Sequence, residues 1–392
     1  MKNKLLAVLM VTVLALSTTA CGSQSSEVRS SDDSDPAAVV ESESSDGTEQ
    51  EASEAAASSE TGVQASQQAD LTLAERVSDE EDHYIFELRD DVTREKVYYR
   101  TRYGIEIAAD LYRPKDFDET KSYAGIVIGP PFGGVKEQGP GVYANELASR
   151  GFVALAFDPA YHGYSGGAPR YTGSSSTYVE DFSAGVDYLG SLSYIDRDRI
   201  GALGICASGG FAISAASMDS RIKAVVTSAL YDIPSLMNGT TGEARKEALD
   251  QAAQLRWKRV DTGEAEWQKN YPEEPMDHIP EDRQGNDAEF FEFYGTSRGW
   301  HYNALGNITG ESQPDMMTLP VTGHVDELNK PLLMITGDVA HSRAFTEDIY
   351  NKASEPKEMV VVEGARHIDL YDDVTKIPFD KIESFYNEAF SN

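Results

Sequence analysis

The chain has 392 residues, with 34 basic and 66 acidic side chains and a formal net charge of −32. This acidic excess would repel nucleic-acid phosphates and gives no electrostatic attraction to anionic lipid headgroups, so we expect no nucleic-acid partner. The length is enough for one large domain or two small ones.

The first twenty residues have the pattern of a bacterial secretory signal. Two lysines precede an apolar run over residues 5–16, and small residues then lead to Ala20-Cys21-Gly22. This predicts a lipoprotein signal peptide over residues 1–20, with the lipid attached to Cys21 as the mature N-terminus. An ordinary cleaved signal and an uncleaved anchor are the alternatives. Lipidation predicts a protein outside the cytoplasm, attached to the bacterial cell membrane through its lipid.

Residues 21–70 consist mainly of Ser, Glu, Ala, Asp, Gln and Thr and include no aromatic residue. Such a segment has too little apolar surface to fold, so we predict a disordered acidic tether ahead of a folded domain over residues 71–392. The chain has two cysteines, Cys21 and Cys206. If Cys21 carries lipid, Cys206 has no disulfide partner.

Strands alternate with helices over most of the folded part, which predicts an α/β fold with a mostly parallel sheet flanked by helices. An antiparallel hairpin around Tyr103-Gly104 precedes them. The expected strands are 124–128, 152–157, 200–205, 224–228, 331–337 and 358–362, and the expected helices are 139–150, 179–192, 207–218, 342–353 and 379–390. The alternation lapses over residues 235–324, a polar stretch with many aromatics. We expect this stretch to form a cap inserted over one end of the sheet.

Cys206 lies where a short apolar strand gives way to an alanine-rich helix, within Gly204-Ile205-Cys206-Ala207-Ser208. Small residues two positions before and after a nucleophile are typical of a nucleophile elbow, where the chain turns too tightly for larger side chains. The helix N-terminus would favour the thiolate. The alternative is a buried cysteine that acts only as a small hydrophobic residue.

Candidate partners for Cys206 follow two other strands, since the carboxyl ends of parallel strands meet at one edge of a sheet. His367 lies just after the last strand and is the expected base. Asp338 lies just after the preceding strand, so the order nucleophile, acid, histidine holds with Asp338 orienting His367. Asp232, after the strand before the cap, is the alternative carboxylate.

The oxyanion of an acyl-transfer intermediate needs backbone N–H donors. We expect one from Ala207 and another from the loop Gly129-Pro130-Pro131-Phe132-Gly133-Gly134. Because prolines have no N–H, Phe132 is the first choice in this loop and Gly133 the second. A rigid packing turn is the alternative interpretation. The seven histidines have no paired spacing and no thiolate cluster exists, so we expect neither a metal nor a cofactor.

From about residue 96 to residue 390 the chain resembles an α/β-hydrolase of the dienelactone-hydrolase-like group. The motifs that carry this resemblance are residues 204–210, the loop 157–167, residues 133–137 and residues 364–367. The resemblance implies an α/β-hydrolase fold and a Cys–His–Asp triad on Cys206, His367 and Asp338. Relatives commonly begin the oxyanion loop with His-Pro, where this chain has Pro130-Pro131.

These features predict a surface-anchored hydrolase that cleaves an ester, lactone or thioester of a small-molecule acyl substrate. An acyl transferase with the same triad is the nearest alternative, because a thioacyl intermediate can react with water or with another nucleophile. A catalytically silent small-molecule-binding lipoprotein that keeps the fold is an alternative from another class. Substrate specificity is expected to reside in the cap.

Overall fold

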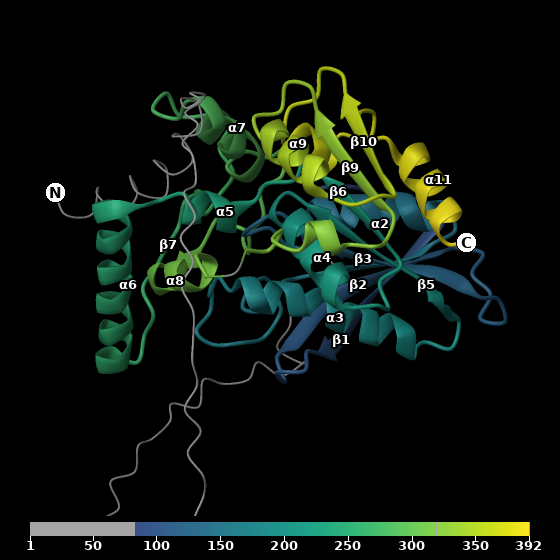
Figure 1. The fold of residues 1–392 in the computed structure, drawn as a ribbon, viewed down its shortest axis with the longest axis horizontal. Coiled ribbons are helices and arrows are strands. Elements are labelled where there is room, and N and C mark those ends of the chain that lie inside the picture. The colour runs from purple at the N-terminus through teal and green to yellow at the C-terminus, as the bar shows by residue number, and fades with distance from the viewer. Residues whose placement is uncertain (1–82, 319, 392) are drawn as a thin grey trace, which may run out of the picture. The chain divides into compact units, whose positions relative to one another are not determined.

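A computed structural model describes residues 83–318 and 320–391, in which an eight-stranded sheet lies between two layers of helices (Figure 1). The predicted signal peptide, the lipidation site Cys21 and the predicted tether lie outside the described residues. No helix within the described ranges is long and apolar enough to cross a membrane.

The sheet has the strand order β1-β2-β4-β3-β5-β6-β9-β10. The β1–β2 and β2–β4 pairs are antiparallel and all the others are parallel, which confirms the predicted hairpin and mostly parallel sheet. The strands are β1 (Val92–Arg100), β2 (Glu106–Pro114), β3 (Tyr123–Gly129), β4 (Val153–Phe157), β5 (Ile195–Ile205), β6 (Ala224–Ser228), β9 (Leu332–Gly337) and β10 (Lys357–Val362). The central strands β4, β6 and β9 are buried along their whole length, because helices cover both faces of the sheet.

The helices lie close to their predicted positions and form two layers. In one layer, α10 (Asp369–Asp372) and α11 (Phe379–Ala389) contact α2 (Gly139–Ser149). In the other, α3 (Ser175–Ser191) packs against α4 (Ala207–Met218), and α9 (Arg343–Lys352) packs on β9. This arrangement brings the loops that follow β3, β5, β6, β9 and β10 to the same edge of the sheet.

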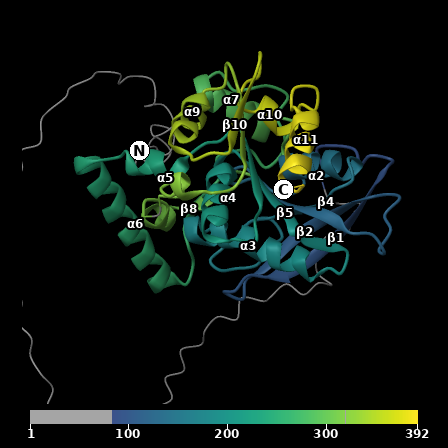
Figure 2. The same cartoon turned by 45° about the vertical axis from the view of Figure 1, so that its right-hand side comes forward.

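The chain between β6 and β9 is largely helical. It contains α5 (Ile233–Asn238), α6 (Gly242–Thr262), α7 (Gly285–Tyr294), η3 (Gly310–Ser312), α8 (Gln313–Met316) and η4 (Val325–Glu327), together with the short pair β7 (Trp267–Gln268) and β8 (Ile308–Thr309). In both views α6 stands at the side of the molecule, where it contacts η3 and α8 (Figures 1 and 2).

Ion pairs tie this insertion to the loop after β10. Arg366 in that loop pairs with Glu292 of α7, and Arg298 of the insertion pairs with both Asp369 and Asp372 of α10. These side chains are partly shielded from solvent, so the pairs are screened less than surface pairs. They hold α7 beside the loop that carries His367.

Candidate active site

Cys206 occupies a sharp turn between β5, which ends at Ile205, and α4, which begins at Ala207. Its backbone has φ +55° and ψ −119°, a strained conformation for a residue with a Cβ atom. At Gly204 a Cβ atom would lie 2.0 Å from the backbone oxygen of Ser208, so only glycine fits this position. The predicted strand–turn–helix around Cys206 is confirmed, and the turn has the tightness that a nucleophile elbow requires.

Replacing Gly204 with alanine should therefore destabilise the protein by about 3 kcal/mol or more, because the clash is with backbone atoms that cannot move aside. The matched control is Gly190→Ala in α3, where the new Cβ would be 3.7 Å from its nearest neighbour. We expect the control to change stability by less than about 1 kcal/mol. Urea unfolding of both variants measures the difference, and equal stability would contradict the tight elbow.

The two expected oxyanion donors lie beside the thiol. The backbone N–H groups of Ala207 and Phe132 both lie close enough to the Cys206 sulfur to lower its pKa, which favours the thiolate. The Ser208 hydroxyl donates to the carbonyl oxygen of Pro130 and so fixes the glycine-rich loop next to the elbow. An oxygen that develops negative charge on a carbon bonded to Sγ would therefore face two N–H donors.

His367 is fully buried in the loop between β10 and α10, and both of its ring nitrogens have partners. Its Nε2 lies 2.8 Å from the hydroxyl oxygen of Tyr371, and its Nδ1 lies 2.6 Å from Oγ of Ser342. The Tyr371 hydroxyl also lies close enough to the Cys206 thiol to lower its pKa. Within the described residues no direct hydrogen bond joins Cys206 and His367, and the Tyr371 hydroxyl lies near the thiol and bonds to the imidazole.

A second histidine lies against His367. The rings of His341 and His367 have their centroids 4.6 Å apart, and Nδ1 of His341 lies 3.2 Å from a carboxylate oxygen of Glu289 in α7. The other oxygen of Glu289 accepts a hydrogen bond from the backbone N–H of Ile368, next to His367. Burial by itself would raise the pKa of Glu289, but these hydrogen bonds lower it. The ring of His341 thus lies between the Glu289 carboxylate and His367.

The structure does not bring Asp338 or Asp232 to His367. Asp338 is exposed, and its carboxylate accepts a hydrogen bond of 2.7 Å from the backbone N–H of Gly364. Asp232 caps α5, where it accepts from the N–H and hydroxyl of Ser235 and from the hydroxyl of Thr322. The expectation that one of these carboxylates orients His367 is therefore not met, because Ser342 occupies Nδ1.

Burial controls the protonation of Cys206 and His367. It raises the pKa of the Cys206 thiol to about 11, against the smaller opposing effect of hydrogen bonds from Tyr371, Ala207 and Phe132. Burial, together with the neighbouring His341, holds the pKa of His367 well below its ordinary value. Near pH 7 the resting site therefore contains a neutral thiol and a neutral imidazole, rather than a thiolate–imidazolium pair.

Alkylation of Cys206 should reflect this raised pKa. Only the thiolate reacts with iodoacetamide, so the labelling rate should rise about tenfold per pH unit from pH 7.5 to 10 and level off near pH 11. In urea the same cysteine should level off near its ordinary pKa of about 8.5. Mass spectrometry of the Cys206 peptide gives both rates. A fast rate in the folded protein that does not change between pH 6 and 8 would contradict a neutral resting thiol.

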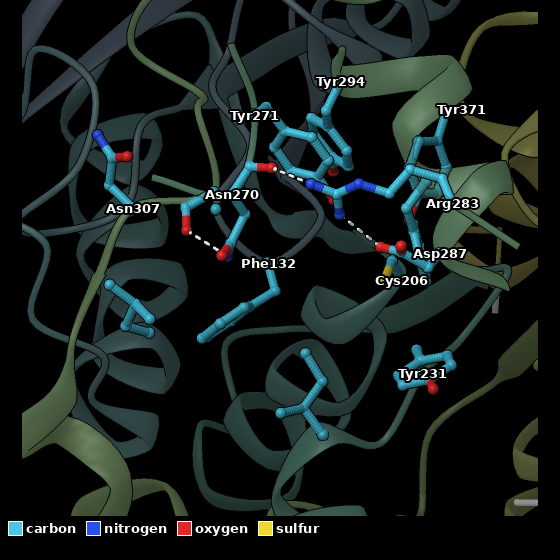
Figure 3. Close-up of a pocket in the computed structure, with 15 residues that line it drawn as sticks. Phe132, Cys206, Tyr231, Asn270, Tyr271, Arg283, Asp287, Tyr294, Asn307 and Tyr371 are labelled. Atoms are coloured by element: carbon cyan, nitrogen blue, oxygen red, sulfur yellow. Dashed lines mark hydrogen bonds and ion pairs between the residues drawn. The ribbon is translucent and has the colours of Figure 1, made fainter. Parts of the chain in front are cut away.

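The elbow opens into a cavity of about 150 Å³ whose lining is mostly apolar and aromatic (Figure 3). Cys206, Phe132 and Tyr371 lie on its wall. Most of the rest of the lining comes from the insertion between β6 and β9: Ile233, Asn270, Tyr271, Arg283, Asp287, Phe290, Tyr294, Gly306, Asn307 and Ile308. Cys206 is 4% exposed, so a molecule that reaches its thiol would be largely withdrawn from water.

Sequence reasoning missed three groups at this site, namely Tyr371, Ser342 and Glu289. Tyr371 follows His367 by four residues at the short helix α10, and this spacing is the one signal that could have indicated it. Ser342 is adjacent to His341 in the loop searched for the acid, but a serine there has no distinctive pattern. Glu289 belongs to a segment with no recognisable motif.

Comparisons with known proteins identify relatives of this chain. Residues 103–369 match the model of the X-Pro dipeptidyl-peptidase (S15) family. The uncharacterized protein PA2218 of Pseudomonas aeruginosa is 44% identical over 77% of this chain and 82% of its own length. The uncharacterized protein YcjY of Escherichia coli is 38% identical over 68% of this chain and 89% of its own length. A shorter stretch, 35% of this chain, is 30% identical to 42% of thiohydrolase aneE of Aspergillus aculeatus.

Solved structures have the same fold. The match to the crystal structure of PA2218 covers 80% of this chain and 98% of the PA2218 chain, with a TM-score of 0.74 and 41% identity. The match to the α/β-hydrolase GrgF from Penicillium sp. covers 76% of this chain and 100% of the GrgF chain, with a TM-score of 0.65 and 20% identity. The fold is therefore that of an α/β-hydrolase, as expected.

Proposed function

Because the chain belongs to the X-Pro dipeptidyl-peptidase (S15) family of α/β-hydrolase enzymes, we propose that it cleaves small-molecule thioesters and esters with Cys206 as nucleophile. The observation that carries this proposal is the position of Cys206. It occupies the strained elbow, opens into the cavity and lies beside two N–H donors and beside Tyr371, which hydrogen-bonds to His367.

The reaction follows from these contacts. Sγ attacks the acyl carbonyl carbon while the thiol proton passes to the Tyr371 oxygen, and the Tyr371 proton passes to Nε2 of His367. The carbonyl oxygen takes the negative charge beside the N–H groups of Ala207 and Phe132. When the carbonyl re-forms, the leaving thiolate or alkoxide takes a proton from His367 and departs. Water then attacks the thioacyl carbon by the same proton route, which releases the acid and restores the thiol.

Two further groups stabilise the imidazolium that forms during each step. Ser342 accepts from Nδ1–H, which fixes the ring with Nε2 towards Tyr371. The Glu289 carboxylate lies against His341 and the backbone next to His367, so it supplies negative charge near the ring. In this proposal Ser342 and Glu289 together take the part that sequence analysis gave to Asp338.

A thiol nucleophile favours thioester substrates. Exchange of one thioester for another has nearly balanced bond energies, whereas an amide would have to expel a poorer leaving group that must first be protonated. The stretch shared with thiohydrolase aneE supports the same substrate class. An acyl transferase remains the second candidate, because the thioacyl carbon opens into a cavity that can admit another nucleophile in place of water.

A panel of acyl donors tests the substrate class. We expect turnover of an N-acetylcysteamine thioester to exceed that of the matching p-nitrophenyl ester when each is corrected for its uncatalysed rate, and an X-Pro p-nitroanilide to be left intact. Added alcohols and amines separate transfer from hydrolysis by the product formed. Faster cleavage of the anilide than of the thioester, lost in Cys206→Ala, would show a peptidase and overturn the proposal.

We also propose that the enzyme is held at the membrane by lipid on Cys21, which lies outside the described residues. The support is the signal-like segment before Cys21 in the sequence. Expression of the full chain and of Cys21→Ser, followed by membrane fractionation, tests this. We expect the wild type in the membrane fraction and the variant outside it, and equal distribution of both would contradict lipid anchoring.

A further inference from the structure

An ion pair stands out in the otherwise apolar cavity. Arg283 and Asp287 of the insertion both line it, with Nη1 of Arg283 at 2.9 Å from Oδ1 of Asp287. Nη2 of Arg283 lies 3.1 Å from the carbonyl oxygen of Asn270. The two side chains are 26% and 23% exposed, so the pair is mostly shielded by the cavity walls. These two bonds occupy only part of the five-donor guanidinium and one of the two carboxylate oxygens.

The pair lies near the reacting centre. Figure 3 shows Arg283 and Asp287 on the same side of the cavity as Cys206 and Tyr371. The Tyr271 hydroxyl lies within electrostatic reach of Asp287, of Arg283 and of Cys206.

A second feature points to a polar ligand. The side-chain oxygen of Asn307, a cavity-lining residue that is 5% exposed, has no hydrogen-bond partner among the described residues. A buried acceptor of this kind is costly unless a ligand group or a water pairs with it. The cavity is thus built for a molecule with an apolar body and at least one hydrogen-bonding substituent.

We infer, on the basis of the proposed function, that the acyl group of the substrate has an apolar body with a neutral hydroxyl group that Arg283 and Asp287 recognise. A hydroxyl group can accept from the guanidinium and donate to the free oxygen of Asp287, so it matches both partners. A carboxylate would be repelled by Asp287 and gains little from an arginine whose charge is already balanced. A plain hydrocarbon would desolvate both charges without replacing their water.

Three thioesters test this inference: the N-acetylcysteamine thioesters of 3-phenylpropanoate, 3-(4-hydroxyphenyl)propanoate and 3-(4-carboxyphenyl)propanoate. Their substituents are remote from the carbonyl, so their intrinsic reactivity is equal. For the full-length wild type we expect kcat/KM for the hydroxyl compound to exceed that for each of the others by about tenfold or more, the effect of one hydrogen bond to a charged group.

Two variants assign the preference to the ion pair. Arg283→Met combined with Asp287→Leu replaces the pair with apolar side chains and should bring the ratio of hydroxyl to phenyl compound to one or below. Arg256→Met, an exposed arginine of α6 that does not line the cavity, should leave the ratio unchanged. If the double variant fails to fold, Asp287→Asn alone should lower the ratio several-fold.

A binding measurement separates failure of this inference from failure of the proposed function. The primary amides of the three acids, titrated calorimetrically into Cys206→Ala, report recognition without chemistry, and the hydroxyl amide should bind about tenfold more tightly. Turnover of all three thioesters at equal rates overturns the inference and leaves the function standing. No turnover together with selective binding overturns the function and supports the inference. Equal binding of all three amides overturns the inference in either case.

Discussion

Replacing Cys206 with alanine should lower kcat/KM for a thioester by at least about 10³-fold, while the protein stays folded. In the proposed mechanism the loss is large because Sγ is the atom that forms the acyl bond, so no other group can take over the same route. Alanine also has a Cβ atom, so the strained φ of +55° costs it no more than it costs cysteine. The melting temperature should change by only a few degrees, which thermal unfolding measures alongside activity.

The control for this variant is Ser214→Ala, a buried small residue in the same helix α4. It should keep full activity, since Ser214 lies two turns along the helix from the elbow. If Cys206→Ala retains more than about a tenth of wild-type activity, the acyl group is not carried by the thiol.

Replacing Tyr371 with phenylalanine should lower kcat/KM by about 10²-fold, the usual contribution of one proton-transfer group. The ring, its edge-to-face contact with Phe293 and its burial are all retained, so only the hydroxyl between Cys206 and His367 is lost. Burial raises the pKa of Tyr371 well above its ordinary value, so this hydroxyl is neutral throughout the assay range, as the proposed proton relay requires. Steady-state kinetics on the thioester measure the effect.

Tyr386→Phe is the matched control for this change. Tyr386 is equally buried, and its hydroxyl donates to the carbonyl oxygen of Ala202 in β5, away from the cavity. Loss of that bond should affect stability by about 1 kcal/mol and leave kcat unchanged. Wild-type activity in Tyr371→Phe would mean that the thiol and the imidazole meet directly during turnover. In that case Tyr371 would be only a packing residue.

The pH dependence of kcat/KM tests the lowered pKa of His367. Because burial and His341 keep the pKa of His367 low, the base is already neutral at pH 6, and activity should not decline between pH 8 and pH 6 as it would with an ordinary imidazole. Glu289→Gln removes the nearby negative charge and should slow turnover several-fold, because the imidazolium is then less stable. A log kcat/KM profile from pH 5 to 9 for both proteins tests this. A decline centred near pH 6.5 in the wild type would show that the pKa of His367 is not lowered.

The fold was predictable because it depends on signals that are local in the chain. Strands such as β4 and β9 are continuous apolar runs, a pattern that only a sheet covered on both faces produces. The elbow was also predictable, since its tight turn imposes small residues at fixed spacing around Cys206. His367 followed from its place just after the last strand.

The partners of His367 were not predictable in the same way. Asp338 satisfies the expected order in the chain, yet its side chain points to the backbone N–H of Gly364 instead. Tyr371, Ser342 and Glu289 reach the histidine through packing between α10, the loop after β9 and α7, which no sequence spacing records. Residues that meet only through tertiary contacts leave no local pattern.

Two of the motifs that carried the family resemblance, residues 133–137 and the loop 157–167, are joined by a buried charge cluster. Lys136 is buried beside the carboxylates of Glu137 and Asp158, and Asp158 also accepts from the backbone N–H groups of Lys136 and Tyr164. This charge cluster ties the loop after β4 to the loop after β3. None of these charged residues lines the cavity.

The central claim, that Cys206 carries the acyl group, is tested most directly by mass spectrometry of the acyl-enzyme. The full-length protein is mixed with a p-nitrophenyl ester, quenched in acid within milliseconds and digested for peptide mapping. We predict that the mass of the acyl group appears on the Cys206 peptide at a level that matches the burst of p-nitrophenol. Acylation of another residue, or the same burst from Cys206→Ala, would contradict the claim.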